Sequence, residues 1–251
     1  MSSQITISIN EEAPMKNTSQ LAKTIYIGPN QRPWAMPRLY QRFWGHYELD
    51  EKSGLYFARE AKAEQIRLVR LNFKRLPQCL QELCRQWRVT FSFAEGATAC
   101  GNSSTFYADF SRHPEEFISP HIEIGSESLK PEKILAHLGH EVCHLFWRTR
   151  SEAQRRAYRG YLARSCGPTT VEITDYVQSH FEDYLDSLKQ FRQNKVHPNF
   201  HDGNFLRWTE ESFCDTVASR LTGTHPDRCE NCTIDLDERL AEIQESLQLA
   251  L

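Results

Sequence analysis

The segment AHLGHEVCHLFW, residues 136 to 147, places His140, Glu141 and His144 in an otherwise apolar run. Burying such side chains away from water is costly unless they find partners. On a helix, residues four positions apart share one face, so His140 and His144 can direct their imidazoles to a single point. Two imidazoles and an adjacent carboxylate are typical of a zinc site in which the carboxylate deprotonates a water molecule. The spacing therefore predicts a zinc centre with Glu141 as the general base.

A third zinc ligand must lie elsewhere in the chain, because catalytic zinc has three protein ligands and one position for water. The segment WTEESFCDTVASRLTG, residues 208 to 223, offers Glu211 and Asp215 four positions apart. On a helix, Glu211 can bind the metal while Asp215 accepts the outer N–H of a ligating histidine. We expect Glu211 as the third ligand and Asp215 as the group that orients a histidine.

Other acidic residues are alternatives for the third ligand. Glu210 precedes Glu211, but helical spacing pairs it with Cys214 and not with a second carboxylate, and this favours Glu211. Glu182 and Asp183 are further alternatives, although such a pair usually belongs to a charged helix face.

His137 lies one turn before His140 and is a candidate for the rim of the site. As a fourth ligand it would close the site to water. No motif identifies a residue that stabilises the transition state. The polar candidates for that role are His197, His201, Tyr176 and Arg207.

HEVCH at 140–144 and ESFCD at 211–215 resemble the HExxH and ExxxD motifs of gluzincin metallopeptidases, the clan of thermolysin and the minigluzincins. The resemblance covers about residues 77 to 223. Glu211 follows His144 by 67 positions, which is longer than in thermolysin-like enzymes and is similar to the long gaps of HtpX-like peptidases.

The resemblance implies roles for individual residues. Zinc would be held by His140, His144 and Glu211, with Glu141 as general base and acid and Asp215 behind a ligating histidine. The strand HIEIG, residues 121 to 125, would be the edge strand on which an extended peptide substrate lies.

Two further features lie outside this motif. Cys229 and Cys232 form a CxxC, which is half of a structural zinc site and would need two more ligands, such as His225 with Cys166 or Cys100. The alternative is a loop with free thiols.

The segment from Arg148 to Arg164 holds six arginines and one glutamate. It is typical of a solvated helix face balanced by acidic neighbours such as Glu182, Asp183 and Asp186. The alternative is a phosphate-binding stripe for nucleic acid.

Composition adds weak constraints. The chain has 251 residues, a formal net charge of −3 and a pI near 6.4, so it has no overall attraction to nucleic acid or anionic lipid. The first 20 residues lack an apolar signal region, and no run of about 20 apolar residues could span a bilayer. We therefore expect a cytoplasmic protein without a membrane partner, whose eight cysteines are mostly thiols.

The spacing of apolar residues predicts the helices and strands that position the site. A helix should begin at Pro77, and three strands should lie within residues 89–93, 104–110 and 121–125. Ser128 is the expected cap of the HEVCH helix, and Thr209 that of the Glu211 helix, which should end at Gly223. Further helices are expected over residues 151–164, 171–193 and 235–250.

The sequence thus predicts an α+β, zincin-like metallopeptidase domain, with a small mixed sheet packed on the HExxH helix. Its expected organisation is an N-terminal extension over residues 1–59, polar and then aromatic-rich, a catalytic domain over 60–223, and a Cys-containing loop and helix over 224–251. The expected function is a zinc-dependent peptidase acting on protein or peptide substrates. The alternative is a catalytically silent zincin-fold binding module, acting near nucleic acid.

Overall fold

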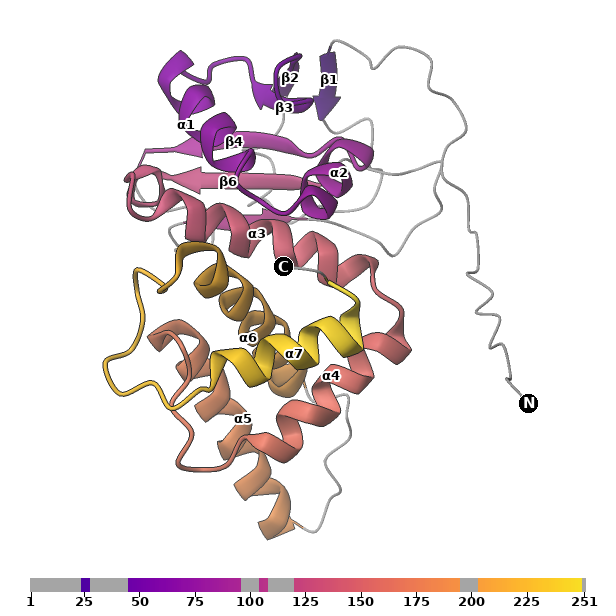
Figure 1. The fold of residues 1–251 in the computed structure, drawn as a ribbon, viewed down its shortest axis with the longest axis vertical. Coiled ribbons are helices and arrows are strands. Elements are labelled where there is room, and N and C mark those ends of the chain that lie inside the picture. Colours follow the sequence, from indigo (N-terminus) through magenta and orange to yellow (C-terminus); the bar gives the residue numbers. More distant parts are fainter. Residues whose placement is uncertain (1–23, 28–44, 96–103, 108–119, 195–202, 250–251) are drawn as a thin grey trace, which may run out of the picture.

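The computed structural model describes residues 24–27, 45–95, 104–107, 120–194 and 203–249, which form a six-stranded sheet and seven α-helices (Figure 1). The strands are β1 (Thr24–Ile27), β2 (Gly45–Asp50), β3 (Leu55–Ala58), β4 (Thr90–Ala94), β5 (Ser104–Tyr107) and β6 (His121–Gly125). The helices are α1 (Ala63–Phe73), α2 (Gln78–Gln86), α3 (Ile134–Thr149), α4 (Glu152–Ser165), α5 (Asp175–Asn194), α6 (Gly203–Thr222) and α7 (Leu236–Leu247), with a short 3₁₀ helix, η4 (Ser126–Leu129). The α+β class is as predicted.

The sheet is mixed, with strand order β1-β2-β3-β4-β6-β5. Strands β3, β4 and β6 are parallel, while β1, β2 and β5 pair antiparallel to their neighbours. Strand β6 therefore lies between β4 and β5, and the expectation that HIEIG is an edge strand is wrong. All five residues of β6 are buried, which is typical of an inner strand. Among the described strands, the edges are β1 and β5.

The sheet extends across residue 60, where the catalytic domain was expected to begin. Strand β3 pairs with β4 through Tyr56 opposite Thr90 and Phe57 opposite Phe91. Tyr47, on β2, is also buried. Part of the aromatic-rich segment therefore belongs to the same sheet as the strands that follow it. The rest, including Trp34, lies outside the described residues.

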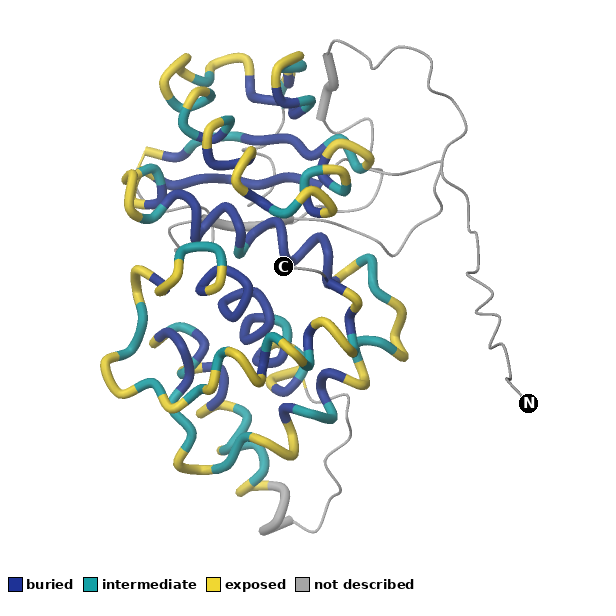
Figure 2. Tube along the Cα trace, viewed as in Figure 1, coloured by how far each residue is buried: buried dark blue, intermediate teal, exposed yellow. Residues whose placement is uncertain are grey.

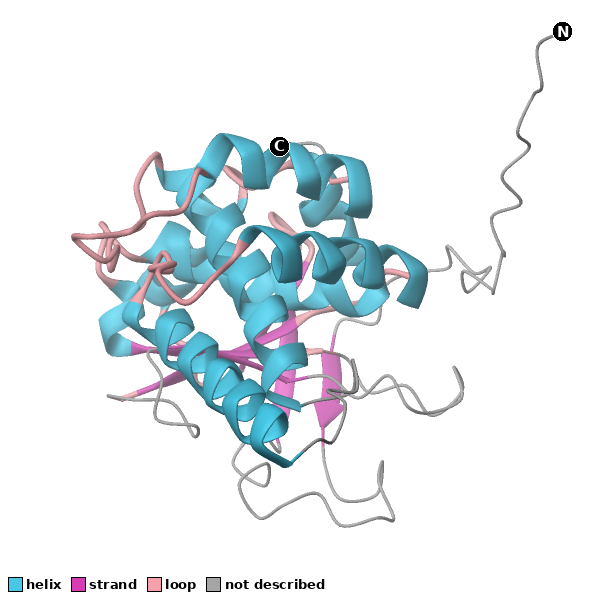
Figure 3. Cartoon of the chain, turned by 90° about the horizontal axis from the view of Figure 1, so that it is seen from below, coloured by secondary structure: helices cyan, strands magenta, loops and turns pink. Residues whose placement is uncertain are grey.

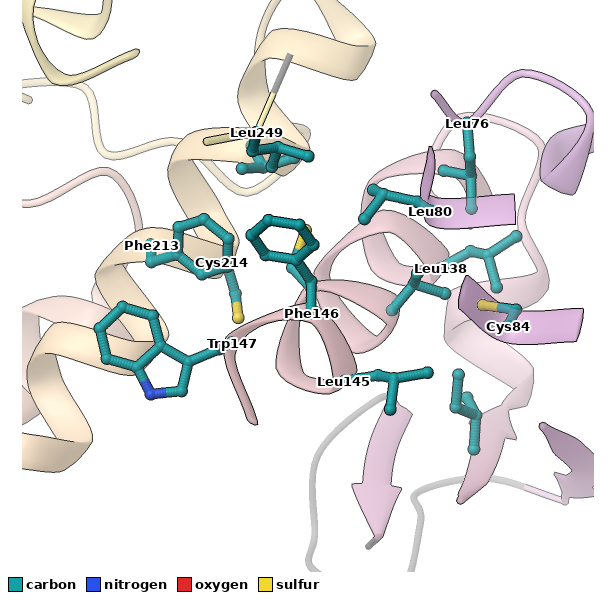
Figure 4. Close-up of a cluster of buried hydrophobic side chains, with 14 of the residues drawn as sticks. Leu76, Leu80, Cys84, Leu138, Leu145, Phe146, Trp147, Phe213, Cys214 and Leu249 are labelled. Atoms are coloured by element: carbon teal, nitrogen blue, oxygen red, sulfur yellow. The ribbon is translucent and has the colours of Figure 1, made fainter. Parts of the chain in front are cut away.

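Helix α3 lies between the sheet and the helices α4 to α7 (Figure 1), and the view from below shows helices in front of the strands (Figure 3). Thirteen of its sixteen residues are buried, which fits a helix with neighbours on most sides (Figure 2). Leu138 and Leu145 point toward the α2 side, where Leu80 and Cys84 lie, whereas Phe146 is directed toward α6 (Figure 4). The helix thus joins the two halves of one hydrophobic core.

The two expected N-caps of the site helices are not caps. Helix α3 begins at Ile134 after Lys133, and the hydroxyl of Ser128 lies instead 2.6 Å from Nδ1 of His137. Helix α6 begins at Gly203, so Thr209 is inside it, and its hydroxyl donates to the Leu206 carbonyl. Serine and threonine bond to nearby backbone in several local settings, so their presence alone does not fix a helix start.

The end of α6 is as predicted, since Gly223 adopts a positive φ of 78°. Beyond it, residues 228–233 run beside the segment 171–174 that links α4 and α5. Backbone N–H groups of Cys229 and Thr233 donate to the carbonyls of Ile173 and Val171. Helix α7 follows and packs on α4 and α6, so the C-terminal segment shares the core of the residues before it.

Candidate metal centre

Helices α3 and α6 bring the predicted site residues together. Along α3, His140, His144 and Arg148 are spaced one turn apart, and they meet the acidic residues of α6 in reverse order. The result is a row of alternating basic and acidic groups between the two helices. We call this row the charged ladder: Asp215, His140, Glu211, His144, Glu210 and Arg148.

Three atoms of the ladder form a small triangle. Nε2 of His140 lies 3.2 Å from Nε2 of His144 and 3.1 Å from Oε2 of Glu211, and the third side, His144 Nε2 to Glu211 Oε2, is 3.5 Å. Zinc bonds to nitrogen and oxygen of about 2.0–2.2 Å in a tetrahedron place neighbouring ligand atoms roughly 3.3–3.5 Å apart. The triangle therefore has the size of one face of a zinc coordination tetrahedron.

The carboxylate oxygen at one corner of this triangle is buried and, in the described part of the chain, unsatisfied. Oε2 of Glu211 is buried and has no hydrogen-bond partner among the described residues, although His140 Nε2 is close. The contact lacks the direction of a hydrogen bond, and an unsatisfied buried carboxylate oxygen is costly. A cation between the three atoms would satisfy it, so the residues present fit a metal ion.

The outer nitrogens of both histidines are held by carboxylates from α6. Nδ1 of His140 lies 2.7 Å from Oδ1 of Asp215, and Nδ1 of His144 lies 2.9 Å from Oε1 of Glu210. Because a carboxylate accepts, Nδ1 carries the proton in each ring, and Nε2 presents its lone pair to the triangle when the imidazole is neutral. This arrangement is the usual support of a metal-binding histidine.

Each supporting carboxylate is itself anchored. The hydroxyl of Thr174 donates to Oδ2 of Asp215 at 2.5 Å, and Nε2 of His225 is 3.8 Å from the other oxygen. On the solvent side, Nε of Arg148 donates to Glu210 at 2.9 Å. Asp215 contacts the outer nitrogen of a histidine, which is the position expected from sequence. Glu210, weighed only as a rival ligand, supports His144 instead.

The charged groups of the ladder strongly shift the pKa values of its histidines and of Glu211. Burial disfavours the charged form of His140, but the adjacent carboxylates of Asp215 and Glu211 outweigh it and raise the pKa well above the ordinary histidine value. The pKa of His144 is raised in the same way, with Glu211 as the main opposing charge to burial. Burial is likewise outweighed at Glu211, whose pKa the two histidines hold well below its usual range. The same negative field that favours imidazolium would attract a metal cation.

A thiol is a second candidate for the third ligand. Cys214 offers its sulfur within 4.8 Å of a ring nitrogen of both His140 and His144. Glu211 fits better for two reasons. Its oxygen is already at coordination spacing, and burial raises the pKa of the Cys214 thiol well above its usual value, whereas a metal ligand must be a thiolate. Cys214 is fully buried and packs in the core beside Phe213 (Figure 4).

Two candidates for stabilising the transition state lie beside Glu211. The hydroxyl of Tyr176 is 3.5 Å from Oε1 of Glu211 and accepts a hydrogen bond from Nη2 of Arg207 at 3.3 Å. Tyr176 is half-buried and Arg207 is exposed. The other two candidates, His197 and His201, lie outside the described residues.

Glu141 is buried on α3, next to His140. His137 is not directed to the triangle, because its two ring nitrogens contact the Ser128 hydroxyl and Oδ2 of Asp227. It is therefore part of a neighbouring network and does not act as a fourth ligand.

The rival acidic pair and the CxxC are not brought to the triangle. Glu182 and Asp183 are exposed on α5. Cys229 donates to Oδ1 of Asp175 at 3.2 Å, and within the described part of the chain neither Cys229 nor Cys232 belongs to a group of three metal-ligand residues. A second zinc ion there remains a prediction from sequence.

The arginine segment is tied to residues other than those expected. Arg155 and Arg159 pair with Glu152 of their own helix, and Arg148 pairs with Glu210. The guanidinium of Arg150 lies over the Phe146 ring, 4.2 Å from its centroid. None of these contacts involves α5 carboxylates, because α4 packs on α7 and α6. A nucleic-acid partner remains a prediction.

Comparison of the chain with protein-family models, with curated proteins and with solved structures found no match. Within the described residues, no helix combines the length and the apolar character needed to cross a membrane. The arguments for function therefore rest on the geometry between α3 and α6.

Proposed function

We propose that this protein is a zinc-dependent peptidase with a gluzincin-like site, in which His140, His144 and Glu211 hold the metal. The observation that carries the proposal is the triangle of ligand atoms with sides of 3.1, 3.2 and 3.5 Å, one corner of which is an orphaned carboxylate oxygen. Asp215 and Glu210 would keep both imidazoles in the ligating orientation.

Zinc bound at this triangle would polarise a substrate carbonyl and acidify a water molecule. Glu141 would take the proton of that water and deliver it to the leaving amine. Tyr176, whose hydroxyl is next to Glu211 and in contact with Arg207, would donate a hydrogen bond to the carbonyl oxygen as negative charge develops on it.

The arrangement of elements supports the zincin-like interpretation. A helix carrying HExxH packs under a mixed sheet, and the carboxylate ligand comes from a later helix. Among the described strands, β5 is an edge strand antiparallel to β6, and it takes the position at which an extended peptide could be added to the sheet. A protein or peptide is the substrate class that this arrangement favours.

A second candidate is a metal-binding module without catalysis. The observation that favours it is the Cys214 sulfur near both histidines. If Cys214 joined His140, His144 and Glu211, the metal would have four protein ligands and no position for water. Cobalt(II) substitution separates the two, because a thiolate ligand gives an intense near-ultraviolet charge-transfer band that a nitrogen and oxygen set lacks.

The proposal is tested by zinc content and hydrolysis together. Untagged wild type should contain one zinc per chain by elemental mass spectrometry, and the His140→Ala/His144→Ala double variant should contain none. On a mixed peptide library, wild type should release new amino termini, and Glu141→Gln should hydrolyse about 10²–10⁴-fold more slowly with its zinc retained.

Absence of zinc in wild type after reconstitution would refute the metal site. Full zinc content with no hydrolysis, together with a thiolate band in the cobalt form, would favour the silent module. A second zinc that survives in the double variant would place another site elsewhere, with Cys229 and Cys232 as the first residues to test.

A further inference from the structure

A buried ion pair lies against α6, between α7 and the segment that links α4 to α5. The guanidinium of Arg239, on α7, is 2 % exposed, and the carboxylate of Glu172 is fully buried. Nη1 of Arg239 donates to Oε2 of Glu172 at 2.8 Å, and Nη2 donates to Oε1 at 3.3 Å. The pair is therefore bidentate, which fixes both the distance and the relative orientation of the two groups.

Both members of the pair also contact α6. Nη1 of Arg239 donates to the hydroxyl of Ser212 at 2.6 Å, and Nε1 of Trp208 donates to Oε1 of Glu172 at 2.9 Å. Trp208 and Ser212 are four positions apart and share one face of the helix. Ser212 directly follows the ligand Glu211, so this contact is one residue from the metal triangle.

The segment 171–174 also contacts α6 one turn further along the helix, at Asp215. Glu172 faces Trp208, and two positions later the hydroxyl of Thr174 donates to Asp215. Trp208, Ser212 and Asp215 are spaced at i, i+4 and i+7, so the segment and Arg239 contact one face of α6, next to the face that carries Glu211. Rotation of α6 about its own axis would break these contacts together.

We infer that Arg239 is a positioning residue for the metal centre and that its ion pair with Glu172 sets the rotation of α6. This inference rests on the proposed zinc site. A carboxylate tip lies roughly 6 Å from the axis of its helix, so a rotation of about 10° moves Glu211 by roughly 1 Å. A metal site needs its ligands held within about 0.5 Å.

The ion pair should affect the position of α6 more than the stability of the fold. A buried ion pair adds little stability compared with apolar groups of similar volume, because desolvation of both charges offsets their attraction. Its removal as a pair should therefore leave folding nearly unchanged, while the ligand geometry of α6 becomes less well defined.

The test uses full-length protein and the double variant Glu172→Gln/Arg239→Met, which removes both charges and keeps an acceptor for Trp208. Zinc Kd is measured by competition with a chromophoric chelator, coordination by the visible spectrum of the cobalt(II) form, and folding by thermal unfolding of the zinc-free protein. We expect at least about tenfold weaker zinc binding and an altered cobalt spectrum, with a Tm close to that of wild type.

The matched control is Asp50→Asn/Arg70→Met. It neutralises the ion pair of Arg70 with Asp50, which joins α1 to the end of β2 and whose side chains are 23 % and 13 % exposed. Zinc affinity should not change in this variant. If both double variants bind zinc with the same weakened affinity, the effect is not specific to α6 and the inference is overturned.

Ser212→Ala is the second variant if the first does not fold, because it removes only the α6 acceptor of Arg239. It should weaken zinc binding by a smaller factor, and wild-type affinity with an unchanged cobalt spectrum would overturn the inference. Wild-type zinc binding in the foldable Glu172→Gln/Arg239→Met variant would overturn it and leave the peptidase proposal intact. Failure of wild type itself to bind zinc would overturn both.

Discussion

The contact between α3 and α6 has two layers of opposite character within the same two helices. One layer is the charged ladder, in which His140 and His144 meet carboxylates. The other is aromatic: the ring of Phe213 lies 6.0 Å from that of Phe146 and 5.5 Å from that of Trp147. The aromatic layer lowers the free energy of the fold by burial, whereas the ladder costs desolvation that a metal ion would recover.

The contrast between the two layers shows how a buried helix can hold polar, metal-binding side chains. Phe146 and Trp147 lie between His144 and Arg148 along α3, so the aromatic contacts fix the separation of the two helices at the ladder. Removal of the aromatic layer should thus affect the whole fold, and changes in the ladder should affect the metal first.

The largest effect is expected in the aromatic layer. Phe213 is fully buried and contacts Phe146, Trp147 and Tyr158. Phe213→Ala should lower the free energy of unfolding by about 3–5 kcal/mol, because it removes buried apolar area and leaves a cavity. Urea unfolding monitored by circular dichroism measures this. Full zinc stoichiometry should persist below the transition, and loss of zinc from the still-folded variant would mean that the layers are not separable.

Removal of the metal should have a comparable effect through the ladder. Zinc at a thousandfold excess over its Kd should add about 4 kcal/mol to the free energy of unfolding, since it binds only the folded chain. A chelator should therefore lower the Tm of wild type and leave that of His140→Ala/His144→Ala unchanged. An equal shift in both proteins would place the stabilising metal outside the ladder.

Within the ladder, substitution of the proposed ligand Glu211 and of the supporting Glu210 should lower the zinc affinity by different factors. Glu210→Gln keeps an acceptor near His144 and should weaken zinc binding about 10–100-fold. Glu211→Gln removes a charged ligand, and it should weaken zinc binding by a larger factor than that range. Chelator competition at constant pH measures both. Equal losses would contradict the assignment of Glu211 as the ligand and Glu210 as the support.

The smallest effect is expected at Cys214, where the two layers meet. Cys214→Ala removes one buried sulfur, so the free energy of unfolding should fall by about 1 kcal/mol and the zinc affinity should stay the same. Cys84→Ala, at another fully buried cysteine on α2, is the matched control. A marked loss of zinc affinity in Cys214→Ala alone would instead make the thiol a ligand.

Local patterns in the sequence predicted most elements from Pro77 onward, whereas β1, β2, β3 and α1 were not predicted. Alternating and helical periodicity located β4, β6, α2 and α7, and the one-turn spacing of His140 with His144 placed both rings toward one point. Asp215 was also placed correctly, because it lies one turn from Glu211 on the face that meets α3. These features depend on residues close in sequence.

The features that were not predicted depend on contacts between residues far apart in the sequence. Nothing local distinguishes an inner strand from an edge strand, since β6 becomes an inner strand only by pairing with β4 and β5. The supporting role of Glu210 had a signal that was overlooked. In antiparallel helices, the partner of His144 should lie about one turn before the partner of His140, which is Asp215. Counting back from Asp215 reaches Glu211 and Glu210, and both are used.

The charged ladder also sets an electrical balance. Its three carboxylates and the guanidinium of Arg148 carry a formal charge of −2 when both imidazoles are neutral. A single divalent cation at the triangle makes the row neutral. A monovalent ion would leave a negative charge in the core and a trivalent ion a positive one, and either is costly away from water. A metal ion at the proposed site would therefore be favoured first by its valence, before size or ligand preference acts.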